Sequence, residues 1–355
     1  MRHLLDNGAY TLKFGLETED PVQFQNCISS IKREVQVAPK NLVNTTEILR
    51  PFDRGILIDP ELQLKIWKSC LAPEVSTLIY TSPLYTPTTS RHSLDELIYE
   101  DLQISSAARV PTGLKSQCLL VDLGFSCITI TPIYKGFPIN YAVIRCQIGG
   151  KLITNYMKEQ ISYRYFDMTE ETWLVNHIRE QTCRVSQNFI KDLRDLQYHL
   201  YRHKKARETV YVLPENNDAG YVLEEGASYG NRQVMSMSNL TISVPELLFR
   251  PSDAGIHCGG VHEGIVESVS RLPKDLGTQL LKNVIVTGGL AKTPGLVQRI
   301  QREVAENVDC EVSVQSSNNE IFACWESLKS VNSLISKKDY EEMGSYYIDS
   351  IGHYP

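Results

Sequence analysis

One local pattern occurs twice in this chain and constrains its fold more than any other feature. "LLDNGAYTLKFG" at residues 4–15 and "LLVDLGFSCITI" at residues 119–130 each pass from apolar residues through Asp-x-Gly into alternating apolar and polar residues. Such alternation is typical of half-buried strands, and glycine permits a tight turn between two of them. Each copy therefore predicts a β-hairpin, and the repetition predicts two similar halves within one chain.

Longer strand and helix patterns follow the second hairpin. Residues 132–150 are typical of strands, residues 151–162 of a helix, and residues 168–205 of one or two helices. Thr169 is the expected N-cap of the last segment, because its hydroxyl can accept from the free backbone N–H groups and two glutamates follow in the first turn. This order of segments predicts an α/β fold.

A glycine turn late in the chain suggests a phosphate-binding element. "NVIVTGGLAKTPGLVQRIQREVAENV" at residues 283–308 predicts a buried strand, a turn at Gly288 and Gly289, and an amphipathic helix that begins near Pro294. A strand, a glycine turn and a helix together present backbone N–H groups where a phosphate or the edge of a nucleotide can bind. Together with the two hairpins, this element favours a ligand-binding role over simple turn chemistry.

Composition excludes several classes of protein. A length of 355 residues predicts about two domains, and 36 Lys and Arg against 42 Asp and Glu give a net charge of −6, which provides no overall attraction to nucleic acid or to an anionic membrane. The nine cysteines contain no Cys-x-x-Cys pair, which argues against a disulfide framework and a zinc cluster. No run of about 18 apolar residues occurs, so no membrane-spanning helix is expected.

The order of these parts resembles the actin superfamily. The similar stretches are residues 80–102, residues 244–300, and residues 325–344 with their "SKKDYEEMG" step. The resemblance implies an α/β actin fold, in which two duplicated ribonuclease-H-like halves surround a central nucleotide cleft and each carries a smaller appended subdomain. It implies a first half of residues 1–112 and 320–355 with a small subdomain at 24–67, and a second half of residues 113–319 with a small subdomain at 149–238.

The resemblance also implies which residues contact a nucleotide, ATP or ADP with Mg²⁺. Lys13 matches the family's phosphate-binding lysine, and Asp6 matches the carboxylate that orders water around the cation. Arg179 and Glu180 match helix positions that reach the base and the ribose, although a solvated helix face is the alternative for that pair. The complete expected set is Asp6, Gly8, Lys13, Asp122, Gly124, Arg179, Glu180, Gly288 and Gly289.

The phosphate-binding hairpins depart from the family pattern. Ala9 and Tyr10 stand where the family has a small hydroxyl residue and a glycine, and Phe125 stands where it has a second carboxylate, with Ser126 next. Alanine offers no side-chain hydrogen bond, a tyrosine obstructs close backbone approach, and a phenyl ring cannot order cation-bound water.

The residue that positions the attacking water also differs. Counting forward from Glu100 puts Thr112 at the family's catalytic glutamine, and Gln103 lies more than two helical turns too early. The sequence therefore predicts a protein that is not an enzyme and has neither catalytic residues nor a dedicated metal site. A nucleotide held without turnover and an empty cleft remain alternatives.

Within the superfamily, residues 99–110 and 134–189 most resemble a nuclear branch of actin-related proteins. This branch implies a non-catalytic architectural subunit of a Swr-type chromatin-remodelling complex, which exchanges an ordinary histone dimer for one carrying histone variant Z. The implied partners are a zinc-HIT subunit, the helicase-like motor ATPase, an AAA+ ATPase ring and the nucleosome. The implied location is the nucleus, with the cytoplasm as a second one, and no membrane contact.

Two other functions remain open, and so does the role of one basic cluster. An ATP-hydrolysing filament protein shares the fold, and a heterochromatin adaptor outside the remodeller cannot be separated from the remodeller subunit by sequence. The densest basic cluster can meet DNA or an acidic partner, but such runs are more often a solvated face. It comprises Arg194, Arg202, Lys204, Lys205 and Arg207.

Overall fold

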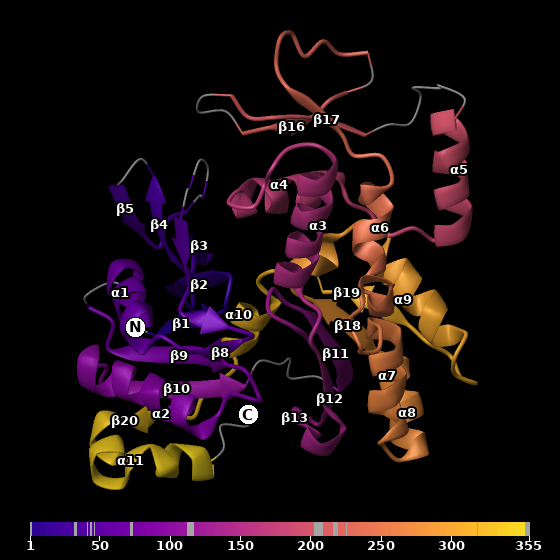
Figure 1. Cartoon of the computed structure of the whole chain (residues 1–355). Helices are drawn as coiled ribbons and strands as arrows, with labels where there is room; N and C mark the ends of the chain where they lie inside the picture. The colour runs from indigo at the N-terminus through magenta and orange to yellow at the C-terminus, as the bar shows by residue number, and fades with distance from the viewer. Residues whose placement is uncertain are drawn as a thin grey trace.

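The computed structural model describes residues 2–351 except 32–33, 41, 43–44, 46, 72–73, 112–116, 202–208, 216–218, 225 and 318. Figure 1 shows two bodies side by side, one in indigo and purple with the yellow C-terminal helices and one in magenta and orange. Each body is built on a mixed sheet that carries one of the two repeated hairpins.

The first sheet has the strand order β20-β10-β9-β1-β2-β3. Its strands are β1 (Arg2–Asn7), β2 (Thr11–Leu16), β3 (Val22–Gln25), β9 (Thr77–Ser82), β10 (Ser106–Pro111) and β20 (Ile335–Ser336). The first predicted hairpin is confirmed, because β1 and β2 are antiparallel and Asp6 lies opposite Lys13. Strand β1 also pairs with β9 in parallel.

The second sheet repeats this arrangement, with the order β13-β12-β11-β18-β19 and β14 paired to β12. Its strands are β11 (Cys118–Leu123), β12 (Ile128–Tyr134), β13 (Phe137–Pro138), β14 (Ile144–Cys146), β18 (Val284–Thr287) and β19 (Val314–Ser316). Strand β11 is antiparallel to β12 and parallel to β18, as β1 is to β2 and β9. The predicted duplication is therefore visible in strand topology. The predicted boundary between residues 112 and 113 lies outside the described residues.

Helices cover both sheets. Those of the first body are α1 (Pro60–Cys70), α2 (Thr88–Glu96), followed by a π-helical turn at Leu97–Asp101, α10 (Ala323–Leu328) and α11 (Lys337–Ile351). Those beside the second sheet are α7 (Val261–Ser270), α8 (Lys274–Leu281) and α9 (Leu296–Ala305). The chain ends meet in the first core, where the indole N–H of buried Trp325 donates to the Leu4 carbonyl at 3.0 Å.

Each body also carries smaller sheets (Figure 1). The first body carries β5-β4-β6, which are Glu34–Val37, Ile28–Ile31 and Glu47–Leu49, and the pair β7 (Phe52–Asp53) and β8 (Ile56–Leu57). The second carries β16-β15-β17, which are Tyr221–Val222, Val210–Val212 and Val234–Ser236. Its helices are α3 (Gly150–Arg164), α4 (Thr172–Thr182), α5 (Phe189–Tyr201) and α6 (Leu240–Glu246).

The predicted helix start at Thr169 is wrong. The Asp167 carboxylate accepts the Thr169 backbone N–H at 3.0 Å and its hydroxyl at 2.7 Å, so the chain forms a turn there and α4 begins at Thr172. Short polar side chains compete with a helix in this way. The segment forms two helices, because the backbone N–H groups of Arg184 and Val185 donate to the Thr241 and Pro294 carbonyls between α4 and α5.

No helix in the described part of the chain has the length and apolar character that crossing a membrane requires.

Candidate nucleotide cleft

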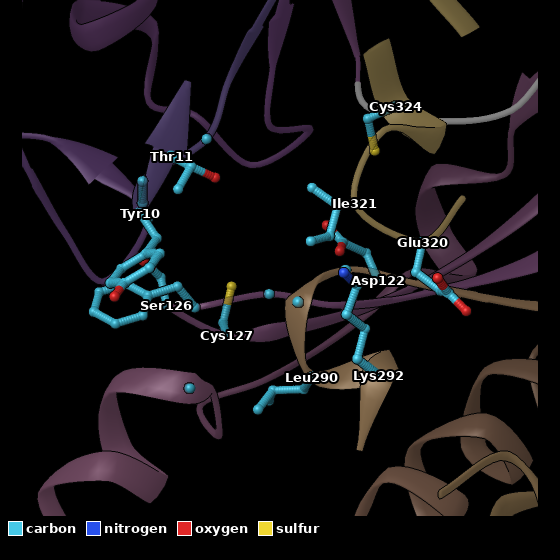
Figure 2. A pocket seen from close by; sticks show the side chains of 18 of the residues that line it. Tyr10, Thr11, Asp122, Ser126, Cys127, Leu290, Lys292, Glu320, Ile321 and Cys324 are labelled. Carbon is cyan, nitrogen blue, oxygen red and sulfur yellow. The ribbon is translucent and has the colours of Figure 1, made fainter. Parts of the chain in front are cut away.

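A cavity of about 570 Å³ lies between the two bodies, against both hairpins, α4 and the Gly-Gly turn. Figure 2 shows Tyr10 and Ser126 on one side of it, and Lys292, Ile321 and Glu320 on the other. Every residue that the resemblance implies for nucleotide binding lines this cavity: Asp6, Gly8, Lys13, Asp122, Gly124, Arg179, Glu180, Gly288 and Gly289. The structure thus brings the whole set together, and its role in binding a nucleotide stays a prediction.

Asp6 and Lys13 form a buried ion pair at the floor of the first hairpin. The Lys13 ammonium donates to Asp6 Oδ2 at 2.8 Å, and the Thr81 hydroxyl donates to Asp6 Oδ1 at 2.9 Å. Burial lowers the pKa of Lys13, but the charge and hydrogen bond of Asp6 outweigh it, so the pKa is raised and the ammonium stays charged. Lys13 therefore brings a fixed positive charge to the cavity.

Asp122 occupies the matching position of the second hairpin without a comparable partner charge. Burial and then the negative charge of Asp6 raise the pKa of Asp122 to about 6, while Lys13 opposes this. Two carboxylates thus share one ammonium at the floor of the cavity. Such a surplus of negative charge suits a site that receives a cation.

Replacing Asp122 by Asn is expected to stabilise the protein at neutral pH by about 1–2 kcal/mol. The folded pKa of about 6 lies above the unfolded value of 3.8, so the folded chain binds the extra proton between these values. The contribution of Asp122 to the unfolding free energy consequently falls as pH rises through this window. Asparagine does not titrate, so the variant should not lose this part of its unfolding free energy.

Urea unfolding from pH 4 to pH 7 measures this effect, with the exposed Asp101→Asn as control. An unchanged pH slope in Asp122→Asn means that Asp122 carries no such penalty.

The Gly-Gly turn forms part of the cavity wall. Gly288 has a φ of +92°, and a Cβ there would lie 2.5 Å from the Leu123 carbonyl oxygen and 2.7 Å from Asp122 Oδ1. At Gly289 a Cβ would meet nothing within 4 Å. The turn therefore packs closely on the second hairpin through Gly288 and leaves the space beside Gly289 open.

Helix α4 supplies polar groups to the same side. One Arg179 Nη donates to Asn176 Oδ1 at 3.0 Å and to Glu180 Oε1 at 3.3 Å, and the buried Arg179 Nε has no partner in the described structure. An unpartnered buried donor is costly and suits a missing acceptor. These residues fit a base and a ribose.

The sequence reasoning missed two cavity residues with clear hydrogen-bonding roles. Asn7 is 4% exposed, and its Oδ1 has no partner in the described structure. Asn176 joins α4 to Tyr10, since its Nδ2 donates to the tyrosine hydroxyl at 3.2 Å. Asn7 is the variable residue of Asp-x-Gly, and Asn176 lies one turn before Arg179 and Glu180, so motif position and helical spacing could have indicated both.

The tips of the two hairpins meet through aromatic rings. The ring centroids of Tyr10 and Phe125 lie 4.6 Å apart, and the Arg50 guanidinium lies 4.3 Å from the first ring and 5.2 Å from the second. Burial raises the pKa of Tyr10, although Arg50 opposes this, so the hydroxyl stays protonated at neutral pH. The hairpin tips thus contact one another through these rings.

The other candidate groups lie elsewhere or outside the described residues. Gln103 does not line the cavity and lies at the surface, where its amide donates to the Glu100 carbonyl. Thr112 lies outside the described residues, as do Arg202, Lys204, Lys205 and Arg207 of the basic cluster. Arg194 is exposed on α5.

Comparisons with known proteins agree with this arrangement. The family model described as Actin matches residues 3–351. The chain is similar to "Actin-like protein arp6" of Aspergillus fumigatus, at 30% identity over 96% of this chain and 92% of the relative. It is also similar to "Actin-related protein 6" of Arabidopsis thaliana and of Drosophila melanogaster, at 30% and 28% identity, each over 96% of this chain and 97% of the relative. With its duplicated sheets and central cleft, the chain belongs to the actin family, and the predicted actin fold is confirmed.

Proposed function

We propose that this protein is a non-catalytic architectural subunit of a chromatin-remodelling complex that exchanges an ordinary histone dimer for one carrying histone variant Z. The observation that carries the absence of turnover is the contact between Tyr10 and Phe125, which fills the space between the hairpin tips with rings. A hydrolytic site needs groups that position a phosphate and a water there. Similarity to actin-related protein 6 supports the assignment to this branch.

The proposed partners are a zinc-HIT subunit, the helicase-like motor ATPase, the AAA+ ATPase ring and the nucleosome, and the proposed location is the nucleus. In an architectural role, residues on the outer surface would provide most of the free energy of partner binding. Tyr163 is 90% exposed at the end of α3, and Tyr165 and Phe166 beside it are 40% and 39% exposed. Neighbouring exposed aromatic side chains are typical of protein interaction sites, which supports this role.

The proposed cofactor is a nucleotide that the protein binds and does not hydrolyse. Arg179, Glu180 and the Gly288-Gly289 turn would hold the base and ribose, and Lys13 would face the phosphates. When bound, the nucleotide supplies a link between the two bodies, since both contribute to the cavity wall.

Purified protein with Mg²⁺ and ATP is expected to show no sustained phosphate release, because the Tyr10 and Phe125 rings touch at the hairpin tips and Thr112 stands at the sequence position of the family's glutamine. Phosphate release under multiple-turnover conditions measures this, with a filament-forming actin as the positive control. Continued turnover, or salt-induced polymers on sedimentation, would contradict the architectural role and favour a filament protein.

Affinity purification from nuclei tests the proposed complex. The expected co-purifying proteins are a zinc-HIT protein, the remodeller motor and the AAA+ ring. Recovery of heterochromatin proteins without the motor would favour an adaptor outside the remodeller, and recovery of cytoskeletal proteins alone would contradict a chromatin role.

A further inference from the structure

Tyr10 lies at a junction of four separate chain segments. Its ring contacts Phe125 of the second hairpin, and its hydroxyl accepts from Asn176 of α4 at 3.2 Å. Its backbone carbonyl accepts from Arg50 at 2.9 Å and from the Asn26 N–H at 2.9 Å. Both bodies and their smaller parts therefore meet at this one residue.

Arg50 reinforces the junction from the side of the small sheets. Its guanidinium faces both rings and donates to the backbone carbonyls of Tyr10 and Asn26, the second at 3.3 Å. Burial lowers the pKa of Arg50, but a guanidinium stays charged at neutral pH. The Arg50 guanidinium thus already contacts two aromatic rings and two backbone carbonyls, and it must give up these contacts to bind a phosphate.

A terminal phosphate at the hairpin tips would compete with this cluster. A phosphate that bridges the two tips at residues 10 and 125 must take the place of the ring contact between them. Admitting it requires separating the rings and moving Arg50, which together forfeit an aromatic pair and cation–π contacts. The associated free energies correspond to about a 10-fold to 100-fold loss of affinity.

The remainder of the cavity stays accessible. The Lys13 ammonium, the unpartnered Asn7 Oδ1 and Arg179 Nε, and the open space beside Gly289 all belong to residues that line it. We propose that Tyr10, Phe125 and Arg50 replace the terminal phosphate as the contact between the two bodies, so that the cavity selects a nucleoside diphosphate over a triphosphate. This selectivity rests on the proposed function, in which the nucleotide is bound without turnover.

Calorimetric titration of the nucleotide-stripped full chain with ADP and with ATP, each with Mg²⁺, tests this selectivity. The expected result is that ADP binds about 10-fold to 100-fold more tightly than ATP. Equal or tighter binding of ATP overturns the inference, because it means that the rings part readily or that Arg50 turns to the phosphate. Binding of neither nucleotide also overturns it.

Variants of Tyr10 show whether the ring causes the selectivity. Tyr10→Ala is expected to bring the two dissociation constants within about 3-fold of each other, whereas Tyr10→Phe keeps the ring and should keep the preference for ADP. Tyr163→Ala, which removes an exposed tyrosine outside the cavity, is the matched control and should bind as the wild type does. A folded Tyr10→Ala protein with unchanged selectivity overturns the inference.

Amide hydrogen exchange tests whether the two hairpin tips contact one another before nucleotide binds. In the stripped wild type, peptides that cover residues 6–13 and 122–129 are expected to be protected before nucleotide is added, and Tyr10→Ala should speed their exchange. Rapid exchange that only nucleotide slows contradicts a ligand-independent closure. Phosphate release distinguishes the two proposals, because tight ATP binding without turnover removes the selectivity and leaves the architectural function standing.

Discussion

Arg299→Ala is expected to destabilise the protein by about 3–5 kcal/mol, one of the two largest effects that the structure predicts for a single substitution. Arg299 is 3% exposed on α9 and donates to the Ser186 carbonyl at 2.6 Å and to Glu246 Oε1 at 3.2 Å. Its guanidinium also lies 5.0 Å from the Phe249 ring. Removing it leaves the 2% exposed Glu246 charged and without this buried partner.

The cost arises from the charge that remains. Burial raises the pKa of Glu246 while Arg299 opposes this, so the guanidinium offsets part of the cost of burying the carboxylate. Combining Arg299→Met with Glu246→Gln should therefore recover a large part of the loss, because neither residue then carries a charge. No recovery in the double variant would show that packing dominates.

Arg302 provides the matched control three residues along the same helix. Its side chain is 40% exposed and pairs with Glu303 and Glu306 near the surface. Exposed ion pairs contribute at most about 1 kcal/mol, so Arg302→Ala should have a small effect. Denaturant unfolding of both variants measures the difference, and equal losses would contradict the buried-charge explanation.

The sequence predicted the two hairpins well because their information is local. Alternation indicates which face of each strand is buried, and Asp-x-Gly indicates the turn, so both hairpins follow from short windows of sequence. The predicted helix start at Thr169 failed although its information is local too. Two local signals competed there, and the sequence did not show that the Asp167 carboxylate would bind Thr169.

The closure at Tyr10 could be only half predicted. The replacement of a glycine by a tyrosine signals that the phosphate turn has changed. Its contacts with Phe125, Arg50 and Asn176 depend on how the two bodies and the small sheets dock, which no short window of sequence records. The same holds for Arg299, whose pairing with Glu303 one helical turn along is visible in sequence while its contact with Glu246 is not.

The two glycines of the late turn should respond very differently to the same substitution. Gly288→Ala is expected to destabilise the protein by about 2–5 kcal/mol. The residue has a φ of +92° and a ψ of 167°, a conformation that is essentially restricted to glycine. The added Cβ would also lie 2.5 Å from the Leu123 carbonyl oxygen, a backbone atom that cannot move without shifting β11.

Gly289→Ala adds the same methyl group to the neighbouring residue, where it would meet nothing within 4 Å, and its effect on the unfolding free energy should stay below about 1 kcal/mol. Thermal and denaturant unfolding of the two variants therefore separate backbone strain from the loss of glycine itself. Equal destabilisation would contradict the close packing of Gly288 on the second hairpin. Because Gly288 also abuts Asp122, its substitution displaces the floor of the cavity and should weaken ADP binding in the protein that remains folded.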